Sequence, residues 1–258
     1  MHASKASLGQ QLAAVFLFLV ILLPLNAVAR ENDTIYRGNQ RLQSFSKTKK
    51  ILQHEVYFDH RQTIYCQASF DQNKEITLPK GFSTPKHEAR ARRLEWEHAV
   101  PCENFGQIFP EWREGHDQCI DNKGQRFNGR KCAEKMNPTY RLMQCDLYNL
   151  FPAIGAVNAL RSNLRYAVLP NEEPTFGSCP MKISQNAAEP PDWAKGEVAR
   201  AALYMDWAYP QFHLSRQQKQ LFTAWHKQYP VSPWECTRSK RIAKIQGNIN
   251  PFIHEFCK

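Results

Sequence analysis

Two adjacent side chains, Glu97 and His98, can carry complementary parts of a hydrolytic reaction. They close the strand-like run Leu94-Glu95-Trp96-Glu97-His98, which stops shortly before Pro101. A carboxylate can bind a hard divalent cation, and an imidazole can take a proton from water near neutral pH. Neighbours on a regular strand point to opposite faces, so we expect the strand to end or bulge here. The pair predicts metal-assisted hydrolysis.

The charge of the chain indicates that the partner is anionic. The chain has 34 Lys and Arg against 24 Asp and Glu, which gives a net charge of +10. Such an excess attracts polyanions over a long range, and nucleic acid and anionic membrane surfaces are both candidates. A basic run over residues 86–93 stands directly before the Glu97 and His98 segment. Charge and chemistry together favour a phosphodiester substrate.

The first 29 residues have the pattern of a secretory signal peptide. Lys5 precedes an apolar run over residues 12–25, and Ala27-Val28-Ala29 offers a small-residue cleavage site. Pro24 interrupts the run before it reaches the roughly 20 residues of a membrane-spanning helix. We therefore expect a signal peptide over residues 1–29, a catalytic domain over residues 30–258, and a location in the periplasm or outside the cell.

All eight cysteines lie beyond the expected signal peptide. An even number in an exported chain indicates disulfides, and the absence of any C-x-x-C pair argues against a zinc site. We expect four disulfides, on which activity depends because they join short elements, although spacing does not determine the pairing. The cysteines are Cys66, Cys102, Cys119, Cys132, Cys145, Cys179, Cys236 and Cys257.

Apolar periodicity predicts a mostly helical, single α+β domain around these residues. Helices are expected over residues 30–50, 139–150, 153–163, 195–208 and 214–227, and short strands over residues 56–58 and 64–70. The polar segment 109–131 holds the turn Asp121-Asn122-Lys123-Gly124 and is expected to be an excursion between two halves of the site.

Several motifs in chain order resemble the endonuclease I family of periplasmic and secreted nonspecific nucleases, from about residue 42 to the end. They are Glu97-His98-Ala99-Val100-Pro101, Gly129-Arg130-Lys131-Cys132, Asp146-Leu147-Tyr148-Asn149-Leu150, Pro152-Ala153-Ile154-Gly155-Ala156-Val157-Asn158 and Arg241-Ile242-Ala243-Lys244-Ile245-Gln246-Gly247-Asn248. The chain departs from the family pattern at Ala156, where the family commonly has a glutamate, and at Gln144, Cys145 and Tyr148, where it commonly has Glu, Ala and His.

The resemblance implies a ββα-metal (His-Me finger) core, in which a β-hairpin supplies a histidine and the following helix supplies a metal ligand. It implies that His98 is the general base, that Glu97 and Asn158 bind Mg²⁺, and that Arg130 contacts the phosphate. Mn²⁺ and Ca²⁺ are further candidate cations. Two oxygen ligands leave Mg²⁺ the waters it prefers, and arginine can bind two phosphate oxygens at once.

The expected activity is sequence-nonspecific cleavage of DNA by a monomer through phosphate contacts, with RNA as a second candidate substrate. The resemblance implies 5′-phosphate and 3′-hydroxyl ends. Asp146, Asn149, Arg161 and Asn163 are expected to be structural or to lie around the site.

Two other functions remain open at this point. A basic, disulfide-rich protein could bind DNA without cutting it, in a manner sensitive to salt and insensitive to chelators. A glycosidase could use Glu97 as its acid, but it would need a second carboxylate about 5 to 9 Å away. Asn158 could also be an ordinary asparagine at a helix end, and Arg130 an ordinary surface arginine.

Overall fold

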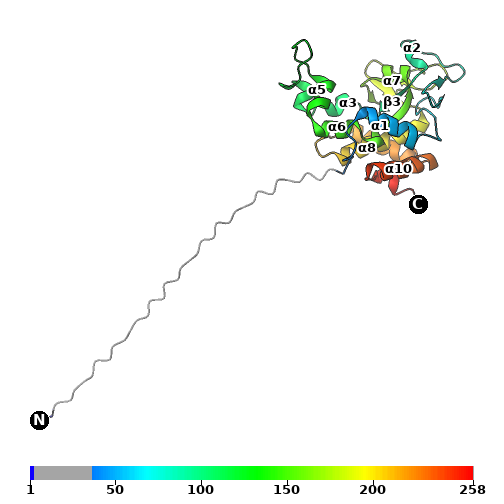
Figure 1. The fold of residues 1–258 in the computed structure, drawn as a ribbon. Coiled ribbons are helices and arrows are strands. Elements are labelled where there is room, and N and C mark those ends of the chain that lie inside the picture. Colours follow the sequence, from blue (N-terminus) through cyan, green and yellow to red (C-terminus); the bar gives the residue numbers. More distant parts are fainter. Residues whose placement is uncertain (3–36, 258) are drawn as a thin grey trace. The chain divides into compact units, whose positions relative to one another are not determined.

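The computed structural model describes residues 1–2 and 37–257, so nearly all of the expected signal peptide lies outside the described residues. The helices and strands of the described residues fall in the compact unit Ile35–Lys258, which has a mixed α+β architecture (Figure 1). In the described part of the chain, no helix is long and apolar enough to cross a bilayer.

A two-stranded antiparallel sheet and the helix after it position three of the four predicted site residues. Strand β3 (Leu94–His98) pairs with β4 (Leu150–Ile154), with His98 opposite Leu150. Helix α7 (Gly155–Arg161) begins directly after β4. The predicted strand is therefore confirmed. It ends at His98, as we expected if the side chains of Glu97 and His98 are to serve one site.

Gly155 allows α7 to start in direct contact with β3. Its amide donates to the Arg93 carbonyl at 3.0 Å, and an added Cβ would lie 2.6 Å from the Arg90 carbonyl oxygen and 2.9 Å from Glu95 Oε1. Contacts this short exclude a side chain unless the backbone moves. The glycine thus fixes the distance between the strand and the helix that carries Asn158.

The N-terminal helix is shorter than expected and continues where a strand was predicted. Helix α1 (Phe45–Ile51) runs into a π-helical turn, η1 (Leu52–Val56). The predicted strand over residues 56–58 is wrong because Leu52 and Val56, four residues apart, are both fully buried on one helical face. The strand over residues 64–70 is confirmed only at its end, in β1 (Ser69–Phe70).

The segment 109–131 is largely irregular and leads into a helix that carries Arg130. After α4 (Pro110–Arg113), the predicted turn is present, with the Gly124 amide donating to the Asp121 carbonyl at 3.1 Å. The φ of Gly124 is +77°, a conformation that favours glycine. Helix α5 (Gly129–Met136) follows.

The predicted helix over residues 139–150 is correct only in its first half. Helix α6 (Pro138–Gln144) ends early, and a 3₁₀ turn, η2 (Leu147–Asn149), leads into β4. Every residue of β4 is buried, including Pro152, so its apolar run has no polar position that would distinguish a strand from a helix. The second predicted helix accordingly begins at Gly155 instead of residue 153.

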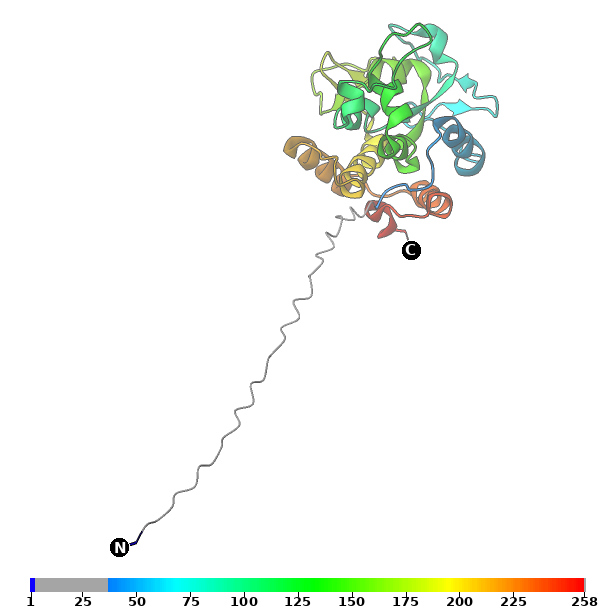
Figure 2. The same cartoon turned by 60° about the vertical axis from the view of Figure 1, so that its left-hand side comes forward.

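Three long C-terminal helices lie on one side of the β3–β4 pair in both views (Figure 1, Figure 2). The helices predicted over residues 195–208 and 214–227 are confirmed as α8 (Asp192–Ala208) and α9 (Arg216–Gln228), whereas α10 (Pro233–Gln246) was not predicted. The short remaining elements are β2 (Ile76–Thr77), α2 (Glu88–Ala91), α3 (Cys102–Gly106), β5 (Arg165–Tyr166), β6 (Lys182–Ile183), β7 (Ala187–Glu189) and α11 (Pro251–His254).

Three disulfides cross-link the unit, so the prediction of four is wrong. Cys102 and Cys145 are free and buried. Burial raises the pKa of each of these two thiols to about 11, which keeps them protonated and unreactive. They therefore pack as small apolar side chains. The bonded pairs are Cys66–Cys179, Cys119–Cys132 and Cys236–Cys257.

Candidate active site

The four predicted site residues line a single cavity of about 750 Å³. Glu97 and His98 reach it from β3, Arg130 from α5 and Asn158 from α7. Residues far apart in the sequence therefore meet at one place. The wall also carries several cationic side chains, namely Lys49, Lys50, Lys74 and Arg90.

The His98 imidazole is held in one orientation. Its Nε2 lies 2.8 Å from the Gln144 carbonyl oxygen, and its ring stacks on Phe45 with the centroids 5.3 Å apart. A carbonyl oxygen can only accept a hydrogen bond, so Nε2 carries the proton of the neutral ring. The lone pair is then on Nδ1, which makes Nδ1 the atom that can act as a base.

The surroundings of His98 keep this ring neutral. The pKa of His98 is lowered to about 3, mainly by burial and secondly by the positive charge of the Arg130 guanidinium. Both effects disfavour the imidazolium form. The ring is therefore unprotonated throughout the physiological pH range, with the Nδ1 lone pair free.

The Glu97 carboxylate has one oxygen engaged and one oxygen available. Oε1 accepts a hydrogen bond from the Tyr65 hydroxyl at 2.9 Å and pairs with Arg161 Nη1 at 2.9 Å. Oε2 accepts no hydrogen bond from residues 37–257. Burial raises the pKa of Glu97, and Arg161 opposes that shift. The pairing with Arg161 favours the ionised form, which a metal ligand must have.

Asn158, the second predicted metal ligand, is hydrogen-bonded to Glu95. Its Nδ2 donates to Glu95 Oε2 at 2.8 Å, while Arg90 and Arg93 also donate to that carboxylate. This bond fixes the amide, so Oδ1 is left without a hydrogen bond within the described part of the chain. Asn158 can therefore offer an oxygen ligand.

Glu95 is a site residue that the sequence analysis missed. It lies two positions before Glu97 on β3, and residues with that spacing share a face of a strand. The signal was therefore present in the sequence, since the carboxylate stands on the same face as the predicted ligand.

The Arg130 side chain is held near its middle and left free at its end. Nε donates to Gln144 Oε1 at 2.9 Å, and the guanidinium carbon lies 5.1 Å from the Phe45 ring centroid. Nη1 and Nη2 make no hydrogen bond within residues 37–257, and no acidic side chain there pairs with Arg130. Its two terminal nitrogens are therefore free to contact a phosphate.

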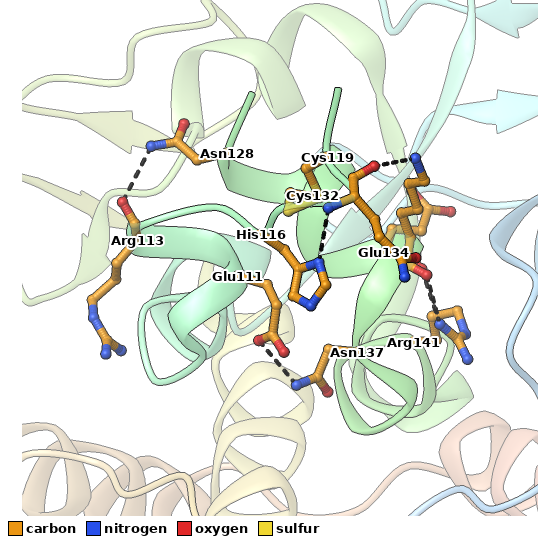
Figure 3. The surroundings of a disulfide bond; sticks show 11 residues. Glu111, Arg113, His116, Cys119, Asn128, Cys132, Glu134, Asn137 and Arg141 are labelled. Atoms are coloured by element: carbon orange, nitrogen blue, oxygen red, sulfur yellow. Dashed lines mark hydrogen bonds between the residues drawn. A yellow bond between two sulfur atoms is a disulfide. The ribbon is translucent and has the colours of Figure 1, made fainter. Parts of the chain in front are cut away.

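Helix α5 is anchored close to Arg130 by the disulfide in Figure 3. Cys132, two residues after Arg130, is bonded to Cys119, and Asn128 Nδ2 donates to the Arg113 carbonyl at 3.1 Å just before the helix (Figure 3). These two ties fix the first turn of α5 and hence the start of the arginine side chain.

The residues expected to be structural have structural partners. Asn149 clamps the turn after His98, since Oδ1 accepts from the Val100 amide at 2.7 Å and Nδ2 donates to the Val100 carbonyl at 3.0 Å. Asp146 accepts from the hydroxyls of Tyr204 and Tyr209, both at 2.7 Å. Arg161 and Asn163 bond to Glu97 and to Glu103, respectively.

The available donor atoms fit a hard cation. Glu97 Oε2 and Asn158 Oδ1 are both oxygens, and Mg²⁺ is typically held by one or two carboxylates or amides while it keeps several waters. Among the described residues, no group of three or more His, Cys, Asp or Glu is arranged to hold a metal. Glu97 and Asn158 thus offer the cavity two oxygen donors that no hydrogen bond occupies among the described residues.

Comparison with known proteins places the chain in a family. The Endonuclease I family model matches residues 31–257. A periplasmic deoxyribonuclease of Aeromonas hydrophila is 36% identical over an alignment that covers 97% of each chain. An extracellular deoxyribonuclease of the same species is 37% identical over 84% of this chain and 91% of its own length. Endonuclease-1 of Buchnera aphidicola is 34% identical over 95% of each chain. The chain therefore belongs to the endonuclease I family and is a nuclease that hydrolyses phosphodiester bonds.

Proposed function

We propose that the protein is an exported, Mg²⁺-dependent endonuclease that cuts DNA without regard to sequence and leaves 5′-phosphate and 3′-hydroxyl ends. The observation that carries the proposal is His98, a neutral imidazole with Nε2 tied to a carbonyl at a cavity lined by cations. Relatives named periplasmic and extracellular deoxyribonucleases support DNA as the substrate and a location outside the cytoplasm.

The arrangement of β3, β4 and α7 supports a ββα-metal core. Two antiparallel strands are followed at once by a helix, the first strand carries the histidine and the helix carries Asn158. Glu97 Oε2 and Asn158 Oδ1 would hold the cation. When bound there, Mg²⁺ supplies Lewis-acid stabilisation of the phosphate and of the departing 3′ oxygen.

His98 acts as the general base through Nδ1. It takes a proton from the water that attacks phosphorus, while the Gln144 carbonyl holds the Nε2 proton and keeps the ring aligned. Arg161 supports this end of the strand, because it donates to the His98 carbonyl at 2.8 Å and pairs with Glu97. Base and carboxylate are thereby fixed relative to each other.

Arg130 contacts the phosphate through its free Nη1 and Nη2. Lys49, Lys50 and Lys74 lie on the same cavity wall and attract the neighbouring phosphates. Contacts of this kind position the backbone without reading bases, which accounts for cleavage at any sequence. RNA carries the same phosphates and is the second candidate substrate.

Plasmid nicking by the purified protein tests the proposal. His98→Ala should lower the rate by about 10²- to 10⁴-fold, the usual contribution of a general base, and EDTA should abolish nicking. The matched control is His54→Ala, an exposed histidine outside the cavity, which should nick like the parent. A His98→Ala variant that nicks as fast as the parent would overturn the assignment. Retention of DNA by the parent with no nicking would support the non-catalytic alternative.

A further inference from the structure

One residue hydrogen-bonds both the proposed base and the proposed phosphate-binding arginine. The Gln144 carbonyl accepts from His98 Nε2 at 2.8 Å, and its side-chain Oε1 accepts from Arg130 Nε at 2.9 Å. No other residue in the described ranges bonds to both side chains. Gln144 is fully buried and does not line the cavity, so it contributes to the site through its hydrogen bonds to His98 and Arg130.

The backbone contact depends on where α6 ends. Gln144 is the last residue of α6, and the final carbonyls of a helix have no partner within the helix. The Gln144 carbonyl is therefore available to His98. The position of the imidazole is set by the end of this helix.

The side-chain contact is fixed by a third group. The Tyr140 hydroxyl, one turn earlier on α6, donates to the same Oε1 at 3.0 Å. Both neighbours are donors, so the carboxamide must present its oxygen to them. Nε2 is consequently buried with no hydrogen-bond partner. An unsatisfied buried donor disfavours folding, so the amide is not explained by stability.

The neutral carboxamide also leaves the charge of Arg130 uncompensated. A carboxylate at position 144 would accept the same two hydrogen bonds but would pair with the guanidinium. Because Arg130 has no acidic partner among the described residues, its full charge is available to a phosphate.

We propose that Gln144 is a positioning residue that aligns Arg130 through its side chain and His98 through its carbonyl, while giving Arg130 no acidic partner that would compete with the DNA phosphate. The inference rests on the proposed function, in which His98 is the base and Arg130 binds the phosphate. It concerns the side chain in particular, because any residue at position 144 supplies a carbonyl.

A double-mutant cycle with Arg130 tests this proposal. Gln144→Leu should lower kcat/KM by about 10- to 100-fold, as removal of a residue that orients a site commonly does. In an Arg130→Ala background the same change should cost less than about twofold, because the group that it positions is gone. Equal losses in the two backgrounds would overturn the proposal.

Gln144→Glu gives a second measurement that does not depend on the leucine variant folding. It keeps the acceptor for Arg130 and Tyr140, so kcat should stay within about threefold of the parent, whereas KM for DNA should rise because the new carboxylate competes with the phosphate. An unchanged KM would overturn the charge part of the proposal.

Gln246→Leu is the matched structural control. Gln246 is buried and bonds to the Leu147 amide and to Asp146, and it does not line the cavity. Its effect on kcat/KM should be the same with Arg130 or Ala at position 130. If His98→Ala stays fully active, the proposed function fails; if only the Gln144 cycle shows no coupling, the inference fails alone.

Discussion

Asn158 Nδ2 lies 2.8 Å from Glu95 Oε2, so the amide of the proposed metal ligand is oriented by a neighbouring carboxylate. That carboxylate is itself held by Arg90, whose Nε and Nη2 lie 2.9 and 2.5 Å from its two oxygens. Asn158 thus presents Oδ1 without having to select an orientation when a cation arrives.

Glu95→Ala should weaken cation binding while leaving the proposed ligands in place. Without its acceptor the Asn158 amide can rotate, so the Mg²⁺ concentration for half-maximal nicking should rise by about 10- to 100-fold. A magnesium titration of nicking measures this, with Glu55→Ala, an exposed carboxylate on η1, as control. An unchanged magnesium dependence would show that Glu95 does not orient the ligand.

Arg161→Met should destabilise the fold. Arg161 is 1% exposed and pairs with Glu97, so its loss leaves a buried carboxylate without a cation. Breaking a buried ion pair on one side commonly costs about 3–5 kcal/mol, and denaturant unfolding measures the loss. Arg165→Met, at an exposed position of β5, should change stability by less than about 0.5 kcal/mol. A similar small change at Arg161 would contradict the pairing.

The stability of the protein should fall in acid because of His98. The folded-state pKa is about 3 and the unfolded value is 6.5, so below about pH 6.5 the unfolded chain binds a proton that the folded chain does not. The contribution of neutral His98 is complete above pH 6.5 and is lost as the pH falls toward 3. Relative to His98→Gln, the parent should lose about 1.4 kcal/mol per pH unit between pH 6 and 4.

Denaturant unfolding of both proteins at pH 4, 5, 6 and 7 checks this prediction, since the other titrating groups are common to the pair. Parallel curves for the two proteins would show that His98 is not held neutral by its surroundings.

The oxidised protein should contain two free thiols. Iodoacetamide should label neither Cys102 nor Cys145 in the native state, because both are buried and burial raises the pKa of each to about 11. Unfolding without a reductant should then allow both to be alkylated, as mass spectrometry would detect. A chain with no alkylated cysteine after unfolding would instead have a fourth disulfide.

The four candidate residues named from the sequence line one cavity, whereas several of the elements that carry them were predicted only in part. Glu97 and His98 were identified because their side chains differ in chemistry and stand at the end of a recognisable strand. The partner strand β4 was not predicted; its residues were divided between the end of one expected helix, a break at Phe151-Pro152 and the start of the next. Its apolar run is buried on both faces, which removes the alternation that marks a strand.

The partners of the predicted residues were harder to foresee. Gln144 holds His98 through a backbone carbonyl. Every residue has this group, so the residue type at position 144 gives no indication of the contact. Arg161 was expected to be structural, but only the fold reveals that it joins Glu97 to the strand end. Such contacts depend on which segments meet, and that is decided by packing over the whole chain.

The two segments that flank Arg130 differ in how far their lengths can change. One residue inserted within α6 would turn the Gln144 carbonyl by about 100° around the helix axis and separate it from His98. The loop between α4 and α5 is closed at its base by Cys119–Cys132, so residues added at its exposed tip need not move α5. Relatives of this enzyme should therefore vary in length at the loop and keep the length of α6 constant.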